Sequence, residues 1–265
     1  MPYVDPASRI SAALRGLHRT AVLRSLAKQL CRNWTITQPF HSGVICLDAV
    51  EHSWAWTGER RYETFDAPLQ TRLLALSLTR DLFVDIGSNI GAMTLSVLLR
   101  NPLIRAVCVE PNARAVTLLR KSLRKNGLTQ RASVVQAAVA RGDGWILFDQ
   151  TESVTGHVAE TGQLARSIGF GSHLSGVCRS RRSLVKIDIE GFEAVVLDQI
   201  GDIVGRGSSC FVIELHPAGF NGFGDPARCI RCLRDAGARI EDLQGGPLGS
   251  VDEAAVTQVV ATFAA

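Results

Sequence analysis

The stretch FVDIGSNIG, from Phe83 to Gly91, is the part of the sequence that decides the fold. Its apolar beginning predicts a buried strand that ends in an acid, and two glycines, Gly87 and Gly91, follow at once. Glycine allows a tight turn and a close approach of the backbone to a ligand or to a neighbouring helix. In a doubly wound α/β sheet, ligands bind at the carboxyl ends of the strands. The stretch therefore predicts a strand, a binding turn and the start of a helix.

Strand-like and helix-like segments alternate on the C-terminal side of this stretch, which predicts βαβ units and a parallel sheet. The last two strands have no helix-length connection, so we expect them to pair antiparallel in a mixed sheet. Residues 151–182 are polar and without clear periodicity, which is more typical of a functional lid than of filler. Predicted strands cover 34–37, 43–49, 52–58, 82–86, 105–110, 132–139, 144–149, 183–189, 210–215, 238–243 and 256–263, and predicted helices cover 67–78, 90–100, 113–127, 192–200 and 226–237.

The composition fits one large domain, or one domain with a small extension. The chain has 265 residues, of which 46% are hydrophobic, and no apolar run reaches the roughly 18 residues of a membrane span. Seven scattered cysteines indicate free thiols in a reducing compartment, so we expect a cytoplasmic protein. The pair Cys229 and Cys232 has no partner pair at zinc spacing, which favours two ordinary helix thiols.

The net charge of +4 is concentrated near the N-terminus, where no acid occurs between Asp5 and Asp48. Apolar residues recur there at helical spacing, which predicts a basic amphipathic helix. Three roles remain open: docking on its own domain or on a second subunit, attraction of residues 8–32 to a membrane surface or an acidic partner, or a cleaved targeting peptide. We assign residues 1–60 to an N-terminal extension with this helix and short strands, and 61–265 to the main domain.

The spacing of the glycine turn selects the kind of cofactor. A nicotinamide or flavin fold needs G-x-G-x-x-G, but Asp85 and Ile90 stand where two of the glycines would be. Asp85 would also repel a pyrophosphate, whereas it would accept hydrogen bonds from an ammonium group near a sulfonium. Glu110 ends the next strand, where an acid typically accepts hydrogen bonds from both ribose hydroxyls. An amino-acid end and a ribose together describe S-adenosylmethionine.

The candidate cofactor residues extend around this turn. Residues at the end of the third strand are placed to border the adenine, and the two residues directly after Gly87 belong to the same binding turn. These further candidates are Gln136, Ala137, Ala138, Ser88 and Asn89.

The motifs FVDIGSNIGAMTL, VEPN, VVQAAVA, LVKIDIEGFE and VIELHP, with RYETF before them, resemble the FkbM family of class I S-adenosylmethionine-dependent methyltransferases. The resemblance extends over about residues 60–217. It implies a Rossmann-like mixed seven-stranded sheet and O-methylation of a hydroxyl on a small molecule or a saccharide. It also adds Glu63, in RYETF, to the candidate cofactor contacts.

Charged residues at two strand ends supply the candidate catalytic groups. Lys186, Asp188 and Glu190 alternate, so an extended strand end would place them on one face. His216 is the candidate general base by its pKa range, with Asp188 or Glu190 next. The alternative is that Glu190 and Glu193 only complement a helix N-terminus and that Asp188 pairs with Lys186. A divalent cation held by the acidic set is a further possibility, although we assign no metal ligand.

The sequence therefore predicts an S-adenosylmethionine-dependent O-methyltransferase, with two alternatives. A nucleic-acid methyltransferase is disfavoured because no NPPY or DPPY motif is present. A protein that binds the cofactor without turnover is disfavoured by the intact turn. A homo-oligomer remains open, and no transmembrane segment is expected.

Overall fold

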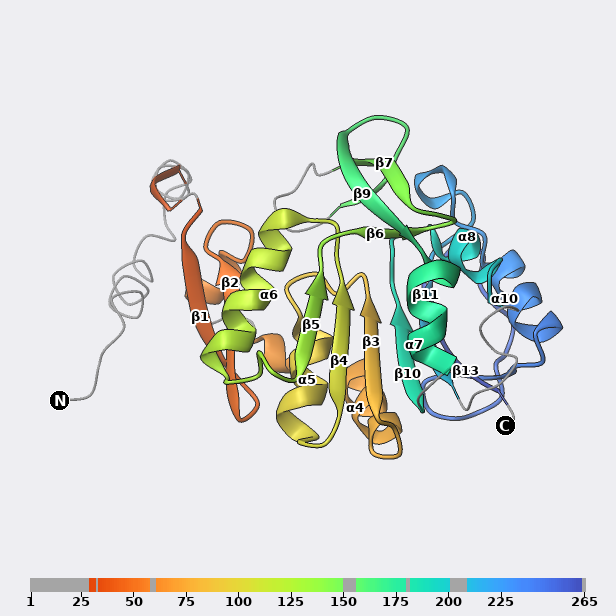
Figure 1. Ribbon diagram of the computed structural model, residues 1–265, viewed down its shortest axis with the longest axis horizontal. Coiled ribbons are helices and arrows are strands. Elements are labelled where there is room, and N and C mark those ends of the chain that lie inside the picture. Colours follow the sequence, from red (N-terminus) through yellow and green to blue (C-terminus); the bar gives the residue numbers. More distant parts are fainter. Residues whose placement is uncertain are drawn as a thin grey trace.

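A computed structural model describes residues 29–31, 33–57, 61–149, 156–179, 182–200 and 209–263. Its centre is a mixed seven-stranded sheet in the order β12-β13-β11-β10-β3-β4-β5 (Figure 1). The five strands β11, β10, β3, β4 and β5 are parallel, and β13 runs antiparallel to both β11 and β12. The strands of this sheet are β3 (Leu82–Ile86), β4 (Arg105–Val109), β5 (Ala132–Val135), β10 (Ser183–Ile187), β11 (Cys210–Leu215), β12 (Arg239–Glu241) and β13 (Thr257–Thr262).

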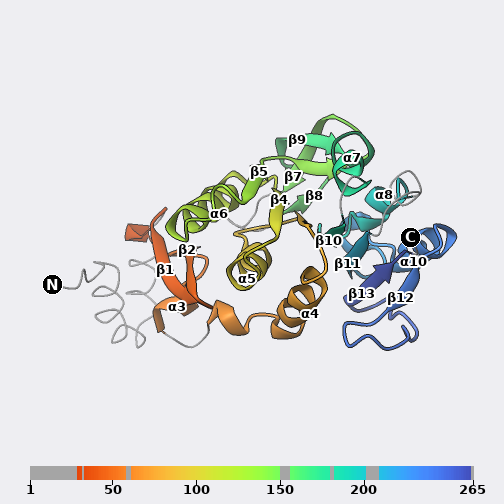
Figure 2. The ribbon, with the colours of Figure 1, turned by 60° about the horizontal axis from the view of Figure 1, so that its bottom comes forward.

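Helices cover both faces of the sheet (Figure 2). One apolar core joins the sheet to α4, α5 and α6, whose buried residues include Leu73, Leu95 and Leu119. A second core on the opposite face includes Leu197 and Leu233. The helices are α4 (Ala67–Ser77), α5 (Ala92–Arg100), α6 (Ala113–Lys125), α7 (Ser175–Arg179), α8 (Glu193–Leu197) and α10 (Pro226–Asp235), with the short turns α3 (Trp54–Thr57), η2 (Tyr62–Thr64), η3 (Phe170–Leu174) and η4 (Phe220–Gly222). The predicted α/β doubly wound fold with a mixed seven-stranded sheet is confirmed.

A second sheet lies over the carboxyl ends of the central strands (Figure 1). It has the order β6-β9-β7-β8, and two of its strands, β8 and β9, belong to the segment that the sequence predicted as a lid without regular structure. Its strands are β6 (Ala138–Ala140), β7 (Gly144–Asp149), β8 (His157–Val158) and β9 (Gln163–Gly169). The predicted strand 132–139 is split because its second half leaves the central sheet and pairs with β9. The lack of structure expected at 151–182 was therefore wrong for its described part.

The described part of the N-terminal extension is a hairpin, β1 (Thr35–Phe40) and β2 (Gly43–Asp48). It docks on α6, where the Cys46 N–H donates to Ser122 Oγ at 2.8 Å and Asn126 bonds both backbone groups of Val44. Phe40 and Leu47 belong to the same core as α5. The domain boundary at residue 60 stays a prediction, and the basic helix predicted before it lies almost wholly outside the described residues.

The strand predicted at 52–58 was wrong, because Trp54–Thr57 form a helical turn, α3. The Trp54 ring packs against His52 and Tyr62, with ring centroids 5.9 and 5.3 Å away. Tertiary contacts among aromatic rings outweigh the strand propensity of this stretch. Within the described residues, no helix has the length and apolar character needed to cross a membrane.

Candidate active site

A cavity that is open to solvent lies at the carboxyl ends of β3, β4 and β10. Gly87 and Glu110 line one part of it, and Asp188 and Glu190 line another. The second sheet closes it with Phe148 from β7 and Val158 from β8. The cavity therefore lies where the glycine turn predicted a ligand.

The two glycines of the turn allow neighbouring elements to pack closely, and Gly87 also borders the cavity. Gly87 has φ +73°, and a Cβ added to it would lie 1.7 Å from the carbonyl oxygen of Asp188. Gly91 has φ +87°, and its Cβ would lie 2.3 Å from a methyl carbon of Leu119. Gly87 lines the cavity, whereas Gly91 faces helix α6 and is absent from the cavity lining. Gly91 thus fits the helix against the turn rather than contacting a ligand.

Glu110 presents a carboxylate to the cavity. Its Oε2 accepts a hydrogen bond from the Asn89 N–H and its Oε1 from the Asn112 N–H, both at 2.8 Å. Burial raises the pKa of Glu110 to about 7, although the two backbone hydrogen bonds oppose this shift. Each carboxylate oxygen keeps a further lone pair. Glu110 can therefore accept two hydroxyl donors, as the predicted ribose contact requires.

Asp85 lies inside the protein and does not line the cavity. Its side chain is 0% exposed; Oδ2 accepts from Thr94 Oγ1 at 2.6 Å, and Oδ1 lies 3.7 Å from Lys186 Nζ. Burial raises the pKa of Asp85, and the charge of Lys186 opposes that shift. The expectation that Asp85 faces the ligand needs correction, since the strand end directs its carboxylate toward α5 and Lys186.

Some of the other cofactor candidates line the cavity and some do not. Asn89, Ala137 and Ala138 line the cavity. Ser88 is buried beside the turn with its hydroxyl lacking a hydrogen-bond partner among the described residues. Gln136 is exposed and lines a neighbouring hollow together with Trp145.

Glu63 is a second correction, because its side chain does not reach the cavity. It lies on η2, is 42% exposed, and approaches His41 at 3.6 Å. The RYETF segment packs at the start of α4 and beside the hairpin, so its acid faces the surface there.

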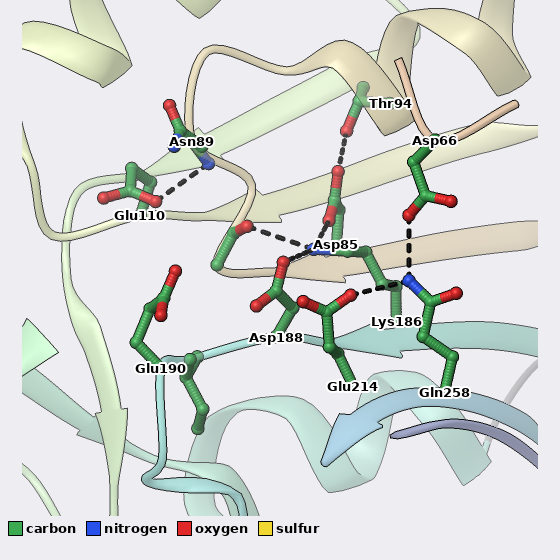
Figure 3. Close-up of polar contacts among 12 residues, drawn as sticks. Asp66, Asp85, Asn89, Thr94, Glu110, Lys186, Asp188, Glu190, Glu214 and Gln258 are labelled. Atoms are coloured by element: carbon green, nitrogen blue, oxygen red, sulfur yellow. Dashed lines mark hydrogen bonds and ion pairs between the residues drawn. The ribbon is translucent and has the colours of Figure 1, made fainter. Parts of the chain in front are cut away.

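Lys186 joins two strand ends (Figure 3). Its ammonium donates to Asp188 Oδ2 at 3.0 Å and to the Gly87 carbonyl at 3.3 Å. Burial alone would lower the pKa of Lys186, but Asp188 and Asp85 outweigh burial and raise it. The sequence alternative that Asp188 pairs with Lys186 is therefore confirmed, and Asp188 still lines the cavity.

Glu214 and Gln258 extend this polar group to the edge of the sheet (Figure 3). Gln258 Nε2 donates to Glu214 Oε2 at 2.7 Å and to Asp66 Oδ2 at 2.8 Å. Burial, followed by the charge of Asp188, raises the pKa of Glu214. Gln258 and Asp66 were not predicted as site residues, because their relation depends on the antiparallel insertion of β13 beside β11.

His216 is held between two carboxylates. Nδ1 lies 3.0 Å from Glu193 Oε1 and Nε2 lies 3.2 Å from Glu190 Oε2, so both ring nitrogens face acceptors. Burial opposes the charged ring, but the hydrogen bonds to Glu190 and Glu193 outweigh it and raise the pKa of His216 to about 10. The role of His216 as general base stays a prediction, and this arrangement does not favour it, because both ring nitrogens already face carboxylates.

The acidic set does not fit a metal ion. Ligand atoms of Asp188, Glu214 and His216 lie within 4.8 Å of one another. However, both nitrogens of His216 face carboxylates, and the ammonium of Lys186 lies against Asp188. A histidine needs a free lone pair to bind a cation. The divalent cation considered from sequence has no support in this donor set.

The cavity wall formed by the second sheet was missed. Phe148 and Val158 belong to strands of the 144–158 region, and Phe148 separates the cavity from the hollow beside Trp145. The alternation in GWILFD predicted the strand β7, but it did not predict that this strand covers the cavity.

Residues 65–144 match the family described as the methyltransferase small domain. This segment includes the glycine turn and Glu110. The match indicates a methyltransferase domain in this part of the chain. No curated protein matches the chain in sequence.

Solved structures of similar fold include several methyltransferases. An O-methyltransferase family protein from Burkholderia thailandensis has 11% identity and a TM-score of 0.46, over 80% of this chain and 59% of that one. An S-adenosylmethionine-dependent O-methyltransferase from Thermotoga maritima has 12% identity and a TM-score of 0.46, over 86% and 84% of the two chains. A precorrin-6y C5,15-methyltransferase from Geobacter metallireducens has 12% identity and a TM-score of 0.45, over 73% and 88%. At these scores we transfer no function from them.

Proposed function

We propose that the protein transfers a methyl group from S-adenosylmethionine to a hydroxyl of a small molecule or a saccharide. The observation that carries the proposal is Glu110, a buried carboxylate that two backbone N–H groups hold at the cavity surface. Such a carboxylate at the end of the second central strand is the group that binds a ribose diol. The FkbM-like motifs of the sequence support the hydroxyl acceptor and the assignment to that family.

The residues around the cavity fit this cofactor. Glu110 would bind the ribose, and Ala137 and Ala138 would border the adenine beside Phe148. The backbone at Gly87 is left for the amino-acid end. When bound, the cofactor supplies a methyl group activated by a positively charged sulfur.

The acceptor side of the cavity is acidic. Asp188 uses Oδ2 for Lys186, and its side chain lines the cavity. We propose that Asp188 orients the acceptor hydroxyl and takes its proton as the hydroxyl oxygen is methylated. Lys186 orients the carboxylate of Asp188, because its ammonium donates to Asp188 and is itself held by a second hydrogen bond to the Gly87 carbonyl.

Calorimetric titration with S-adenosylhomocysteine tests the cofactor assignment. We expect one site per chain, and a Glu110→Gln variant should bind at least about 30-fold more weakly because it loses the charged acceptor. Glu160→Gln is the matched control, since Glu160 is exposed and is not one of the residues that line the cavity. A Glu110→Gln variant that binds as tightly as the parent would refute the ribose assignment.

Methyl transfer from labelled cofactor to panels of phenols, sugars and nucleic acid tests the acceptor class. Asp188→Asn should lower kcat by roughly 10²–10⁴ with its cofactor affinity nearly unchanged. A chelator should leave the activity unchanged, because the acidic set does not fit a metal. Transfer to nucleic acid alone would contradict the proposed acceptor and support a nucleic-acid methyltransferase. Cofactor binding without transfer to any member of the panels would support a binding protein without turnover.

A further inference from the structure

The loop between β10 and α8 holds an acid in an unfavourable conformation. Glu190 has φ +54°, a left-handed value that costs a residue other than glycine about 1 kcal/mol or more. Its side chain is 45% exposed and lines the cavity. Such a conformation persists only where surrounding contacts stabilise it, so the contacts of this loop bear on the site.

Glu193 fixes the backbone of the loop. Its Oε1 accepts hydrogen bonds from the N–H groups of Ile189, at 3.1 Å, and Gly191, at 3.2 Å. The same oxygen lies 3.0 Å from His216 Nδ1. A buried carboxylate with three donors is strongly held, so the loop is anchored from within the protein.

His216 connects Glu193 to Glu190. With Nδ1 directed to Glu193, its Nε2 points to Glu190 Oε2 at 3.2 Å. Asp188 and Glu214 also have oxygens within 4.8 Å of a ring nitrogen, and the Phe220 ring lies 4.9 Å away, centroid to centroid. The four carboxylates around the ring favour its cationic form, and the ammonium of Lys186, bonded to Asp188, lies on the far side of this group and opposes them.

The charged side chains that line the cavity are acidic. They are Glu110, Asp188 and Glu190, and none of the described lining residues is a lysine or an arginine. If the ribose lies at Glu110 and the adenine at Ala137, the part of the cavity near Asp188 and Glu190 remains for the sulfonium. S-adenosylmethionine carries one positive charge more than S-adenosylhomocysteine, so a carboxylate fixed there distinguishes the two.

We propose that His216 is a positioning residue that holds the carboxylate of Glu190 against the sulfonium end of the cavity, and that this contact makes the site prefer the cationic cofactor over the neutral product. The inference rests on the proposed function. The preference would aid release of the product, because the attraction disappears with the sulfur charge.

Two substitutions of His216 separate its two contacts. In His216→Asn the amide nitrogen takes the place of Nδ1 and can still bond Glu193, but nothing replaces Nε2. In His216→Gln the amide nitrogen lies near the Nε2 position and can bond Glu190 without a charge. Glu190→Gln removes the charge itself, and Glu160→Gln is the matched exposed control.

The measurement is the ratio of the dissociation constants of S-adenosylhomocysteine and S-adenosylmethionine, by calorimetry. We expect His216→Asn and Glu190→Gln each to lower this ratio roughly 3- to 10-fold, as expected for loss of one fixed charge in a partly solvated cavity. His216→Gln should give a smaller decrease. The double variant His216→Asn/Glu190→Gln should change it no more than Glu190→Gln alone, because both act through one contact.

A merely structural role for His216 would weaken both ligands by the same factor and leave the ratio unchanged, which would overturn the inference while the proposed function stands. Failure of the parent protein to bind either ligand would instead remove the proposed function and the inference with it. A ¹⁵N spectrum of the imidazole near pH 7.5 gives an independent readout. We expect both nitrogens of His216 to be protonated, and a neutral ring would overturn the inference even if both ligands bind.

Discussion

Glu110 combines burial, a raised pKa and two backbone hydrogen bonds within one carboxylate. Asp85, one strand away, is buried more completely, is paired with the ammonium of Lys186 and accepts a hydrogen bond from Thr94. The two acids therefore differ in availability: Glu110 faces a cavity and can bind, whereas Asp85 is used inside the protein. The sequence predicts acids at both strand ends, but it does not show which way each one points.

Cofactor affinity should depend on pH through Glu110. Because burial raises the pKa of Glu110 to about 7, the free protein binds a proton there as the pH falls below 7, and the ribose hydroxyls then lose an ionised acceptor. Between about pH 7.5 and pH 6 the ionised fraction falls about eightfold, so the affinity for S-adenosylhomocysteine should fall by a similar factor.

Calorimetry at a series of pH values measures this dependence. The Glu110→Gln variant should bind weakly with little change over the same range, since its amide does not titrate. A parent protein whose affinity stays constant from pH 6 to pH 8 would contradict the assigned role of Glu110.

Gly87 should be indispensable to folding. Alanine at this position would place its Cβ 1.7 Å from the Asp188 carbonyl oxygen, so β3 and β10 would have to separate. We expect Gly87→Ala to lower the free energy of unfolding by about 4 kcal/mol or more. Gly127→Ala is the control: Gly127 has φ +69° but nothing within 4 Å of its added Cβ, so the loss should be only about 1–2 kcal/mol.

Urea denaturation compares the two glycine variants under the same conditions. Equal losses would show that the cost at Gly87 is the left-handed conformation alone and not the contact with the Asp188 carbonyl.

At the scale of elements, long periodic segments were predicted well and contact-dependent ones were not. Helices α4, α5, α6 and α10 and the strands of the central sheet follow from periodicity and from the glycine, proline and asparagine residues at their ends. The second sheet was missed because β9 pairs with β6 and β7, which are distant in sequence. The strand β7 follows from its own sequence, whereas its pairing with β8 and β9 does not.

The hairpin β1–β2 should depend on one side chain of α6. Asn126 accepts from the Val44 N–H at 2.9 Å and donates to the Val44 carbonyl at 2.7 Å. Asn126→Ala removes both bonds, so we expect a loss of about 1–3 kcal/mol in the free energy of unfolding and faster hydrogen exchange in the hairpin. Arg124→Ala, at an exposed position of the same helix, should cost less than about 0.5 kcal/mol. A hairpin with unchanged exchange rates in Asn126→Ala would contradict this anchor.

At the scale of the whole molecule, two sheets enclose one cavity. The central sheet supplies Gly87, Glu110 and Asp188, and the second sheet supplies Phe148 and Val158. The central half of this site follows from the sequence, because the carboxyl ends of parallel strands meet at one edge. The part of the site formed by Phe148 and Val158 cannot be predicted from the sequence, because it depends on how the second sheet packs over the carboxyl ends of the central strands.

Cofactor binding should therefore protect both sheets from hydrogen exchange. With S-adenosylhomocysteine at about 100 times its dissociation constant, the ligand stabilises the fold by about 2.7 kcal/mol. We expect slower exchange around Gly87 and Ile189 and also in β7 and β8, measured by mass spectrometry. Protection limited to the central sheet would show that the second sheet does not close over the ligand.

The charged group of buried Asp85 and Lys186 with the cavity-lining Asp188 limits which substitutions this protein can accept. Replacing the lysine alone would leave two neighbouring carboxylates without their cation, and replacing one aspartate alone would weaken the hold on the ammonium. Loss of one member of a buried ion pair typically costs about 3–5 kcal/mol. We therefore expect related sequences to change these three positions together or to keep them all. Covariation among homologues would then indicate these contacts, which cannot be inferred from one sequence.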